Sequence, residues 1–241
     1  WKGIPSSSSH GLVGGLVGAV LLAAGSGHVV WGWPPEGHLV GVAKVLLALV
    51  LSPVLGFVVG YLVHKLSHLL TRAAHPRINQ KLRLAQYVTT AALAFSHGAN
   101  DAQKSMGVLT LVLVLGGFIP HFEVPFWVML ACATAITAGI LSGGWRIVRT
   151  LGFAVFKVRP LHALDSQLTS GLVILSASMM GAPVSTSHVV ATSIMGIGAS
   201  ERPHRVHWGK AGEIATTWLI TLPASAAMAA LVLLALRPWV V

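Results

Sequence analysis

Long apolar stretches alternate with short polar ones along most of the chain, which is the pattern of a protein built from membrane helices. Residues 39–63, 125–143 and 211–236 are each long enough to cross the hydrocarbon core of a bilayer, which takes about 20 residues. Residues 12–24 are equally apolar but too short to cross it. The pattern therefore predicts three plain spans and one helix that ends within the membrane.

Two further apolar stretches, 84–117 and 167–199, carry polar motifs in their interior. In the first, Gly98 is expected to unwind the backbone, so that Asn100 and Asp101 cap a second half-helix. Such an interruption frees backbone polar groups at membrane depth, where they are tolerated only if they line a site or a cavity.

Composition agrees with a membrane protein. Only 9% of the 241 residues are charged, 54% are hydrophobic, and the mean hydropathy is +0.77. Soluble domains carry about 25% charged residues, so too little charge is available here to cover a surface that faces water. With Cys132 as its single cysteine, the chain has neither an intrachain disulfide nor a cysteine-based metal cage.

The formal net charge of +10 comes from basic loops that alternate with loops free of Lys and Arg. Basic loops face the cytoplasm, and we expect these to contact anionic lipid of the bilayer rather than nucleic acid. Residues 64–83, 145–159 and 201–210 are basic, whereas residues 25–38 and 118–124 contain no Lys or Arg.

The segment 167–199 lies between two successive basic loops. It should therefore enter and leave the membrane on one face, as a re-entrant hairpin of two half-helices. Just before it, residues 145–158 mix basic and bulky apolar side chains, which predicts a helix lying in the cytoplasmic interface.

An internal repeat links the two ends of the chain. Residues 3–10 (GIPSSSSH) and residues 181–188 (GAPVSTSH) agree at five of eight positions, at an offset of 178 residues. The first copy leads into an outside loop and the second into an inside loop, so one copy is inverted relative to the other. Inverted repeats with interrupted helices are typical of secondary transporters, whose binding site lies near the membrane midplane.

The predicted fold class is all-α: a polytopic membrane protein with inverted repeats, interrupted helices and re-entrant hairpins. Residues 1–24 are expected to be the second arm of a hairpin that ends a first repeat. Residues 25–83 hold a spanning helix and a basic cytoplasmic loop, and residues 84–241 form the second, inverted repeat. Because the chain opens inside a hairpin, without a methionine, we expect a fragment that lacks its N-terminal half.

The repeated motif combines a helix break with a cluster of hydroxyl groups. The first N–H groups of the helix that follows have no intrahelical acceptor, and together with the helix dipole they favour an anion. The alternative is that serine and threonine only cap or pack helices, but two inverted copies favour a site for one tetrahedral oxyanion. The candidate side chains are the hydroxyl groups and the histidine of each copy: Ser7, Ser8, Ser9 and His10 in the first, and Ser185, Thr186, Ser187 and His188 in the second.

Asp101 is a carboxylate within an apolar stretch. An ionisable group there costs at least about 2.5 kcal/mol and is functional by default. A carboxylate beside an anion needs H⁺, Na⁺ or another cation, which is the chemistry of coupled symport. Asn100 and Asp101 can offer oxygens to that cation, while Gln103 and Lys104 supply donors. The alternative is an Asp101–Lys104 ion pair that only neutralises itself.

Other candidate chemistry is weaker. His64 and His68 have a spacing compatible with zinc, but the sequence offers no third ligand beside them, so no metal site and no cofactor are expected. Asp165 is expected to cap a helix. The G-x-S-G motif of an intramembrane serine hydrolase is absent from the sequence, and we do not expect an enzyme.

These motifs closely resemble those of the inorganic phosphate transporter (PiT) family. GANDAQKSMG at 98–107 and the two G-x-P-x-S-[ST]-S-H motifs carry the resemblance. It implies a symporter of inorganic phosphate, carried in some relatives as a metal–phosphate complex, driven by H⁺ or Na⁺. It puts phosphate contacts on Ser7, Ser8, Ser185 and Thr186, and phosphate or cation contacts on Asn100, Asp101 and Gln103.

The resemblance also implies a bacterial plasma-membrane protein, and a homodimer is one assembly we consider. Family members carry two GAND-type motifs and this chain has one, in line with a missing N-terminal half. A sulfate permease of the same fold and a non-transporting membrane scaffold remain as alternatives. Because protonated phosphate can donate a hydrogen bond, an acceptor such as Asp101 favours phosphate over sulfate.

Overall fold

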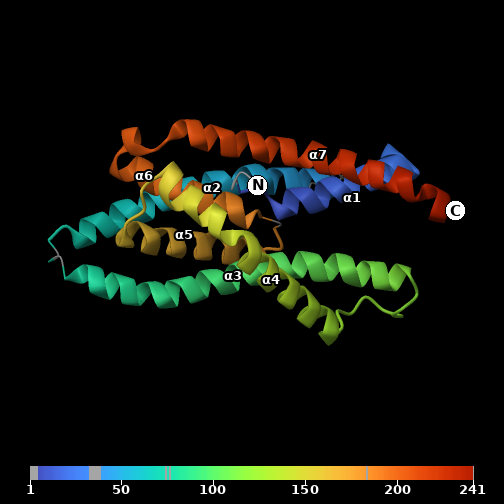
Figure 1. Cartoon of the computed structure of the whole chain (residues 1–241), viewed down its shortest axis with the longest axis horizontal. Helices are drawn as coiled ribbons and strands as arrows, with labels where there is room; N and C mark the ends of the chain where they lie inside the picture. Colours follow the sequence, from blue (N-terminus) through green and yellow to red (C-terminus); the bar gives the residue numbers. More distant parts are fainter. Residues whose placement is uncertain (1–4, 33–38, 74, 76, 183, 241) are drawn as a thin grey trace.

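The computed structural model describes residues 5–32, 39–73, 75, 77–182 and 184–240 (Figure 1), and within them every regular element is helical, as predicted. Gly3 and Pro183 of the repeated motif lie outside the described residues. The helices are α1 (Ser8–Ala24), α2 (Gly41–Thr71), α3 (Ile78–Leu115), α4 (Phe126–Arg149), α5 (Pro160–Met179), α6 (Thr186–Glu201) and α7 (Trp208–Val240), with the short η1 (Ser26–His28), η2 (Thr150–Val155) and η3 (Pro203–Arg205).

Within the described residues, three helices are long and apolar enough to cross a bilayer: Gly41–Thr71, Phe126–Val155 and Trp208–Pro238. They coincide with the three plain spans that the hydrophobic pattern predicts. Their outward faces carry exposed large apolar side chains, which is the surface a bilayer requires. α2 continues through Pro53, which cannot donate to the carbonyl of Leu49, and the hydroxyl of Ser52 donates to that oxygen instead, at 3.3 Å.

The two arms that follow the repeated motif run in opposite directions. Figure 1 shows α1 and α6 starting near the middle of the molecule, with α1 leading toward the end where α7 finishes and α6 toward the end where α7 begins. α5 and α6 form a hairpin whose open side lies at that second end, together with the basic loops. The inversion expected from the repeat is therefore present in the fold.

Close helix packing holds these arms in place. The most extensive helix pairs are α2 with α6, α1 with α7, and α3 with α5. On α1, Gly14 faces Leu222 and Ser225, and Gly18 faces the backbone of Ala226 so closely that a Cβ atom would collide with it. Small residues at such contacts let two helices approach each other in a membrane.

The GAND segment does not break its helix, so the expectation of an unwound backbone at Gly98 is wrong. α3 runs without interruption from Ile78 to Leu115. One glycine costs a helix only about 1 kcal/mol, and α3 contains no proline to remove a backbone donor. Asn100 and Asp101 therefore lie on the face of a continuous helix instead of capping a new one.

The segment 145–158 also differs from the expectation of a separate interfacial helix. α4 continues into the π-helical turn η2, so that one helix extends from Phe126 to Val155. Leu151, Val155 and Phe156 at its end are buried in a core shared with α6 and α7, whereas Trp145 and Phe153 are exposed. That core contains Leu151, Val155, Phe156, Ala191, Ile194, Met195, Val206, Ala211, Ile214 and Trp218.

Candidate functional site

The start of α1 and the turn between α5 and α6, called the two tips below, meet against one face of α3. Because α3 is a continuous helix, His97, Asp101 and Lys104 are four and three residues apart and share that face. The tips are built alike: Ser7 caps α1 by accepting from the backbone N–H of His10 at 3.2 Å, and Ser185 caps α6 by accepting from that of His188 at 3.4 Å. The same motif therefore presents a capped helix N-terminus from each side.

Lys104 ties the three elements together. Its ammonium nitrogen donates to the hydroxyl of Ser9 at 2.7 Å and to the backbone carbonyl of Val184 at 2.8 Å. It also lies 3.4 Å from Oδ1 of Asp101. The ion pair considered from the sequence is present, but Lys104 does more than neutralise Asp101, because it bridges the two tips.

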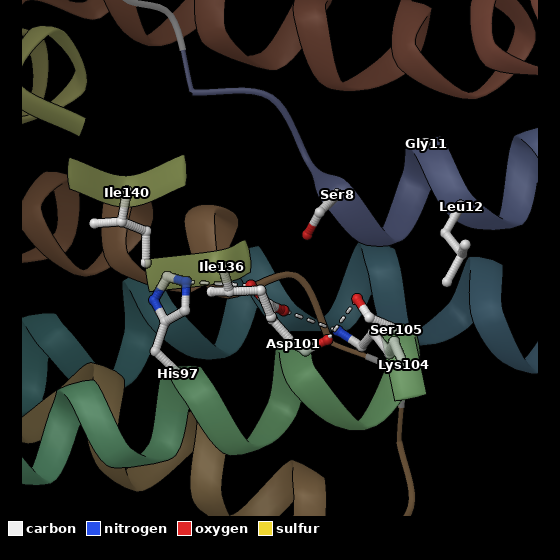
Figure 2. Close-up of a pocket in the computed structure, with 9 residues that line it drawn as sticks. All are labelled: Ser8, Gly11, Leu12, His97, Asp101, Lys104, Ser105, Ile136 and Ile140. Carbon is white, nitrogen blue, oxygen red and sulfur yellow. Dashed lines mark hydrogen bonds and ion pairs between the residues drawn. The ribbon is translucent and has the colours of Figure 1, made fainter. Parts of the chain in front are cut away.

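Asp101 is surrounded by donors. Its Oδ2 lies 3.1 Å from Nε2 of His97 and accepts from the hydroxyl of Thr186 at 3.2 Å. Its Oδ1 accepts from the side-chain amide of Asn100 at 3.2 Å, in addition to the contact with Lys104. The carboxylate is thus shared between α3 and the second tip, and Figure 2 shows it between His97 and Lys104 on α3.

Asn100 is buried between α3 and the α5–α6 turn. Its amide nitrogen donates to the carbonyl of Val184 at 3.2 Å, and its amide oxygen accepts from the hydroxyl of Ser178 at 3.3 Å. Since Ser9 and Lys104 also donate to the Val184 carbonyl, one backbone oxygen receives three donors. Neither Ser178 nor Val184 was singled out from the sequence, although Val184 lies within the repeated motif.

A cavity of about 430 Å³ opens beside these groups (Figure 2). Ser8, His97, Asp101 and Lys104 supply polar groups to it, whereas α1 and α4 contribute apolar walls. A positive charge, a helix N-terminus and a hydroxyl on one side can hold an anion, while the carboxylate can accept a hydrogen bond. The lining residues are Ser8, Gly11, Leu12, His97, Asp101, Lys104, Ser105, Ile136 and Ile140.

Some of the predicted binding residues line the cavity, whereas others cap helices or lie outside it. Ser8 lines the cavity and is exposed, while the hydroxyls of Ser7 and Ser185 are engaged as helix caps. Ser187 donates to the backbone carbonyl of Ser6 at 3.1 Å and so joins the tips. Gln103 is exposed and is not among the residues that line the cavity. The binding roles assigned to all of these residues stay predictions.

The two motif histidines point away from the cavity toward α7. The ring of His188 stacks on Trp218 with centroids 3.8 Å apart, and Nδ1 of His10 lies 3.0 Å from the backbone carbonyl of Trp218. The indole N–H of Trp218 donates to the carbonyl of Pro5 at 3.2 Å. The histidines therefore pack against α7 and position the tips.

The fold and the site together define a polytopic α-helical membrane protein in which two oppositely directed helices, α1 and α6, begin near a cavity lined by α1, α3 and α4. A family model described as "Phosphate transporter family" matches residues 1–229, and the chain belongs to that family. With its bacterial relatives and its bilayer-crossing helices, it is an integral protein of the plasma membrane.

Curated relatives extend beyond the matched region. Proteins named "Probable low-affinity inorganic phosphate transporter" from Bacillus subtilis (strain 168) and Rhizobium meliloti (strain 1021) are 39% and 40% identical, over 96% and 95% of this chain and 68% and 67% of their own lengths. A protein of that name from Mycobacterium leprae (strain TN) is 36% identical over 95% of this chain and 54% of its own length.

A solved structure entitled "The sodium-dependent phosphate transporter" has the same fold. It superposes with a TM-score of 0.82, covering 98% of this chain and 74% of the other, at 23% sequence identity. At that identity the likeness concerns the fold alone.

Proposed function

We propose that this chain binds inorganic phosphate at the junction of the two hairpin tips and carries it by symport with H⁺ or Na⁺. The observation that carries the proposal is the placing of Lys104 and Asp101 side by side, with Nζ and Oδ1 3.4 Å apart, where both tips reach α3. Lys104 supplies positive charge for an anion, and Asp101 supplies negative charge for a coupling cation.

The anion half of the proposal rests on Lys104 and the tips. Lys104 is mostly buried, so its ammonium acts in surroundings of low dielectric constant, where charge interactions are strong. Ser8 adds a hydroxyl group at the cavity wall, and the N-terminus of α1 adds the positive end of its helix dipole. A phosphate oxygen could replace Ser9 or the Val184 carbonyl as the partner of Lys104.

The cation half rests on Asp101. A second negative charge in the cavity would repel this carboxylate, and a proton or Na⁺ on Asp101 removes the repulsion. Thr186 and Asp101 supply hard oxygen atoms from two different elements, so binding of a cation there would also hold the second tip against α3. Anion and cation would then favour one another's binding, as symport requires.

Phosphate fits the site better than sulfate does. Inorganic phosphate keeps at least one proton near neutral pH and can donate it in a hydrogen bond to Asp101, whereas sulfate offers only acceptors. Sulfate would therefore place an oxygen without a proton beside an oxygen of ionised Asp101, and no hydrogen bond could form between the two.

A binding measurement on the purified chain tests this function. Labelled phosphate should bind, should be displaced by excess unlabelled phosphate, and should be displaced poorly by sulfate. Lys104→Gln should weaken binding by at least tenfold, because a hydrogen bond to a charged group contributes about 1.5–3 kcal/mol. The matched control, Lys157→Gln at an exposed lysine outside the cavity, should bind like the wild type. Equal displacement by sulfate, or binding unaffected by Lys104→Gln, would contradict the proposal.

Three finer points remain predictions from the sequence: the identity of the coupling ion, a contribution from an N-terminal half, and a homodimeric assembly. The chain spans about two thirds of the length of the relatives from Bacillus subtilis and Rhizobium meliloti, and about half of the length of the relative from Mycobacterium leprae. Uptake is accordingly proposed for the carrier as a whole, and the binding measurement addresses the site that lies within this chain.

A further inference from the structure

A second polar cluster lies at the open side of the α5–α6 hairpin, away from the phosphate cavity. His64 on α2, His162 near the start of α5 and Glu201 at the end of α6 each place one nitrogen or oxygen atom within 4.8 Å of the others. Glu201 and the α6 tip are separated by the sixteen residues of α6, about 22 Å at 1.5 Å per residue. The cluster is therefore distinct from the site at the tips.

A carboxylate orients the ring of His64, as is usual for a histidine that binds a metal. Its Nδ1 lies 2.7 Å from Oδ2 of Asp165, whose other oxygen accepts from Ser67 at 2.7 Å. A carboxylate on one ring nitrogen fixes the tautomer and leaves the other nitrogen free to bind a metal. Asp165 lies inside α5 and is fully buried, so the expectation that it caps a helix is wrong.

The remaining nitrogen of His64 is unexplained by the protein alone. Nε2 is buried, in a side chain that is 2% exposed, and it has no hydrogen-bond partner among the described residues. If His64 is neutral, Asp165 is a buried carboxylate with no cation beside it; if His64 is protonated, Nε2–H is a buried donor without an acceptor. Both states are costly, and a cation bound to Nε2 relieves both.

His162 and Glu201 complete the set. Nε2 of His162 lies 3.0 Å from a carboxylate oxygen of Glu201, and Nδ1 of His162 accepts from the backbone N–H of Arg159 at 3.1 Å. The neutral ring therefore carries its proton on Nε2, between the two side chains. A metal ion that binds Nε2 would displace this proton, as metals do when they bind histidine. The proton would move to Nδ1, and the hydrogen bond from the backbone N–H of Arg159 to Nδ1 would then be lost.

We propose that His64, His162 and Glu201 form a binding site for a divalent transition-metal ion of the zinc class, with Asp165 as the group that orients His64. Two imidazole nitrogens and one carboxylate suit Zn²⁺, whereas Mg²⁺ and Ca²⁺ prefer oxygen ligands throughout. The carboxylates of Glu201 and Asp165 offset a divalent ion, while the guanidinium of Arg159, whose Nη1 lies 3.6 Å from Oε1 of Glu201, adds one positive charge beside it. The sequence pairs His64 with His68 and predicts no metal; the fold instead supplies the further ligands from residues about 100 and 140 positions away.

A metal ion here would join α2 to both arms of the hairpin. α5 contributes His162 near its first turn, and α6 contributes Glu201 as its last residue. The ion would fix the open side of the hairpin against α2, while leaving the tips at the phosphate cavity untouched.

Equilibrium dialysis of the purified chain against Zn²⁺ tests the proposal, with a purification tag that contains no histidine. The wild-type protein should retain about one Zn²⁺ per chain, and Co²⁺ in its place should give the visible absorption bands of a low-symmetry nitrogen–oxygen site. His64→Gln and Glu201→Gln should each weaken binding by at least about tenfold, and Asp165→Asn by about 10- to 100-fold.

His68→Gln is the matched control. His68 lies one turn along α2 with its ring 6.3 Å from that of His64, but it is exposed and is not part of the cluster. This variant should bind zinc like the wild type. Failure of the wild type to retain zinc, or equal loss in His68→Gln and His64→Gln, would overturn the proposal. Circular dichroism and size-exclusion profiles identify any variant that fails to fold, and Glu201→Gln, at a half-buried residue, keeps the test decisive if His64→Gln does not fold.

Discussion

His10 and His188 occupy the same position in the two copies of the repeated motif, and their rings contact one another edge to face with centroids 4.6 Å apart. Each ring also reaches Trp218 on α7, His188 by stacking and His10 through the backbone carbonyl. The two inverted arms thus contact one another directly at equivalent residues, a contact called the joint below, and Trp218 of α7 contacts both histidines.

This joint makes Trp218 a strong determinant of stability. Trp218→Ala removes the stacking partner of His188 and the donor to Pro5, so we expect a loss of about 3 kcal/mol in the free energy of unfolding. Unfolding of the purified protein by denaturing detergent measures it. Trp127→Ala, at a largely exposed tryptophan of α4, should change the free energy little. An equal loss in both variants would show that the joint contributes nothing specific.

Gly18 and Gly11 lie on the same helix and should respond to alanine in opposite ways. At Gly18 a Cβ atom would collide with the backbone of Ala226, so Gly18→Ala should lower the free energy of unfolding by about 1–3 kcal/mol. At Gly11 nothing lies within 4 Å, and Gly11→Ala should stabilise α1 by up to about 1 kcal/mol. Unfolding by denaturing detergent measures both changes in the free energy of unfolding. A decrease in Gly11→Ala would contradict the packing described for α1.

The orientation predicted from loop charge can be tested by labelling. In a variant lacking Cys132, a cysteine at Ser26 should react with an impermeant maleimide from outside the cell, because η1 follows the arm that leads away from the basic loops. Cysteines at the exposed residues His75 and His204 should react only after the membrane is opened. Labelling of His75 from outside would reverse the orientation, whereas labelling of His204 alone from outside would refute the re-entrant hairpin.

The repeated motif was the most informative feature of the sequence. Five identities over eight residues predict two equivalent helix starts, and the fold brings Ser7 and Ser185 to equivalent caps. Local chemistry was enough there, because a proline, a hydroxyl and a glycine act on their own neighbours.

Features that depend on distant contacts were not predictable in this way. Gly98 is compatible with either a broken or a continuous helix, and packing against α5 accompanies the continuous one. The partners of His64 are far away in the sequence, and one of them, Asp165, looks like a helix cap until α2 is seen beside α5. A spacing rule that searches for ligands a few residues apart cannot find such a cluster.

We propose that Asp101 accepts the coupling cation, and the cation dependence of labelled-phosphate binding to the purified protein tests this role. In the wild type, binding should rise with Na⁺ or with H⁺ concentration. In Asp101→Asn, which keeps the shape and removes the charge, that dependence should disappear. If the pair of Asp101 and Lys104 only neutralises itself, Asp101→Asn should keep the wild-type dependence on cation concentration, and that result would contradict a coupling role for Asp101.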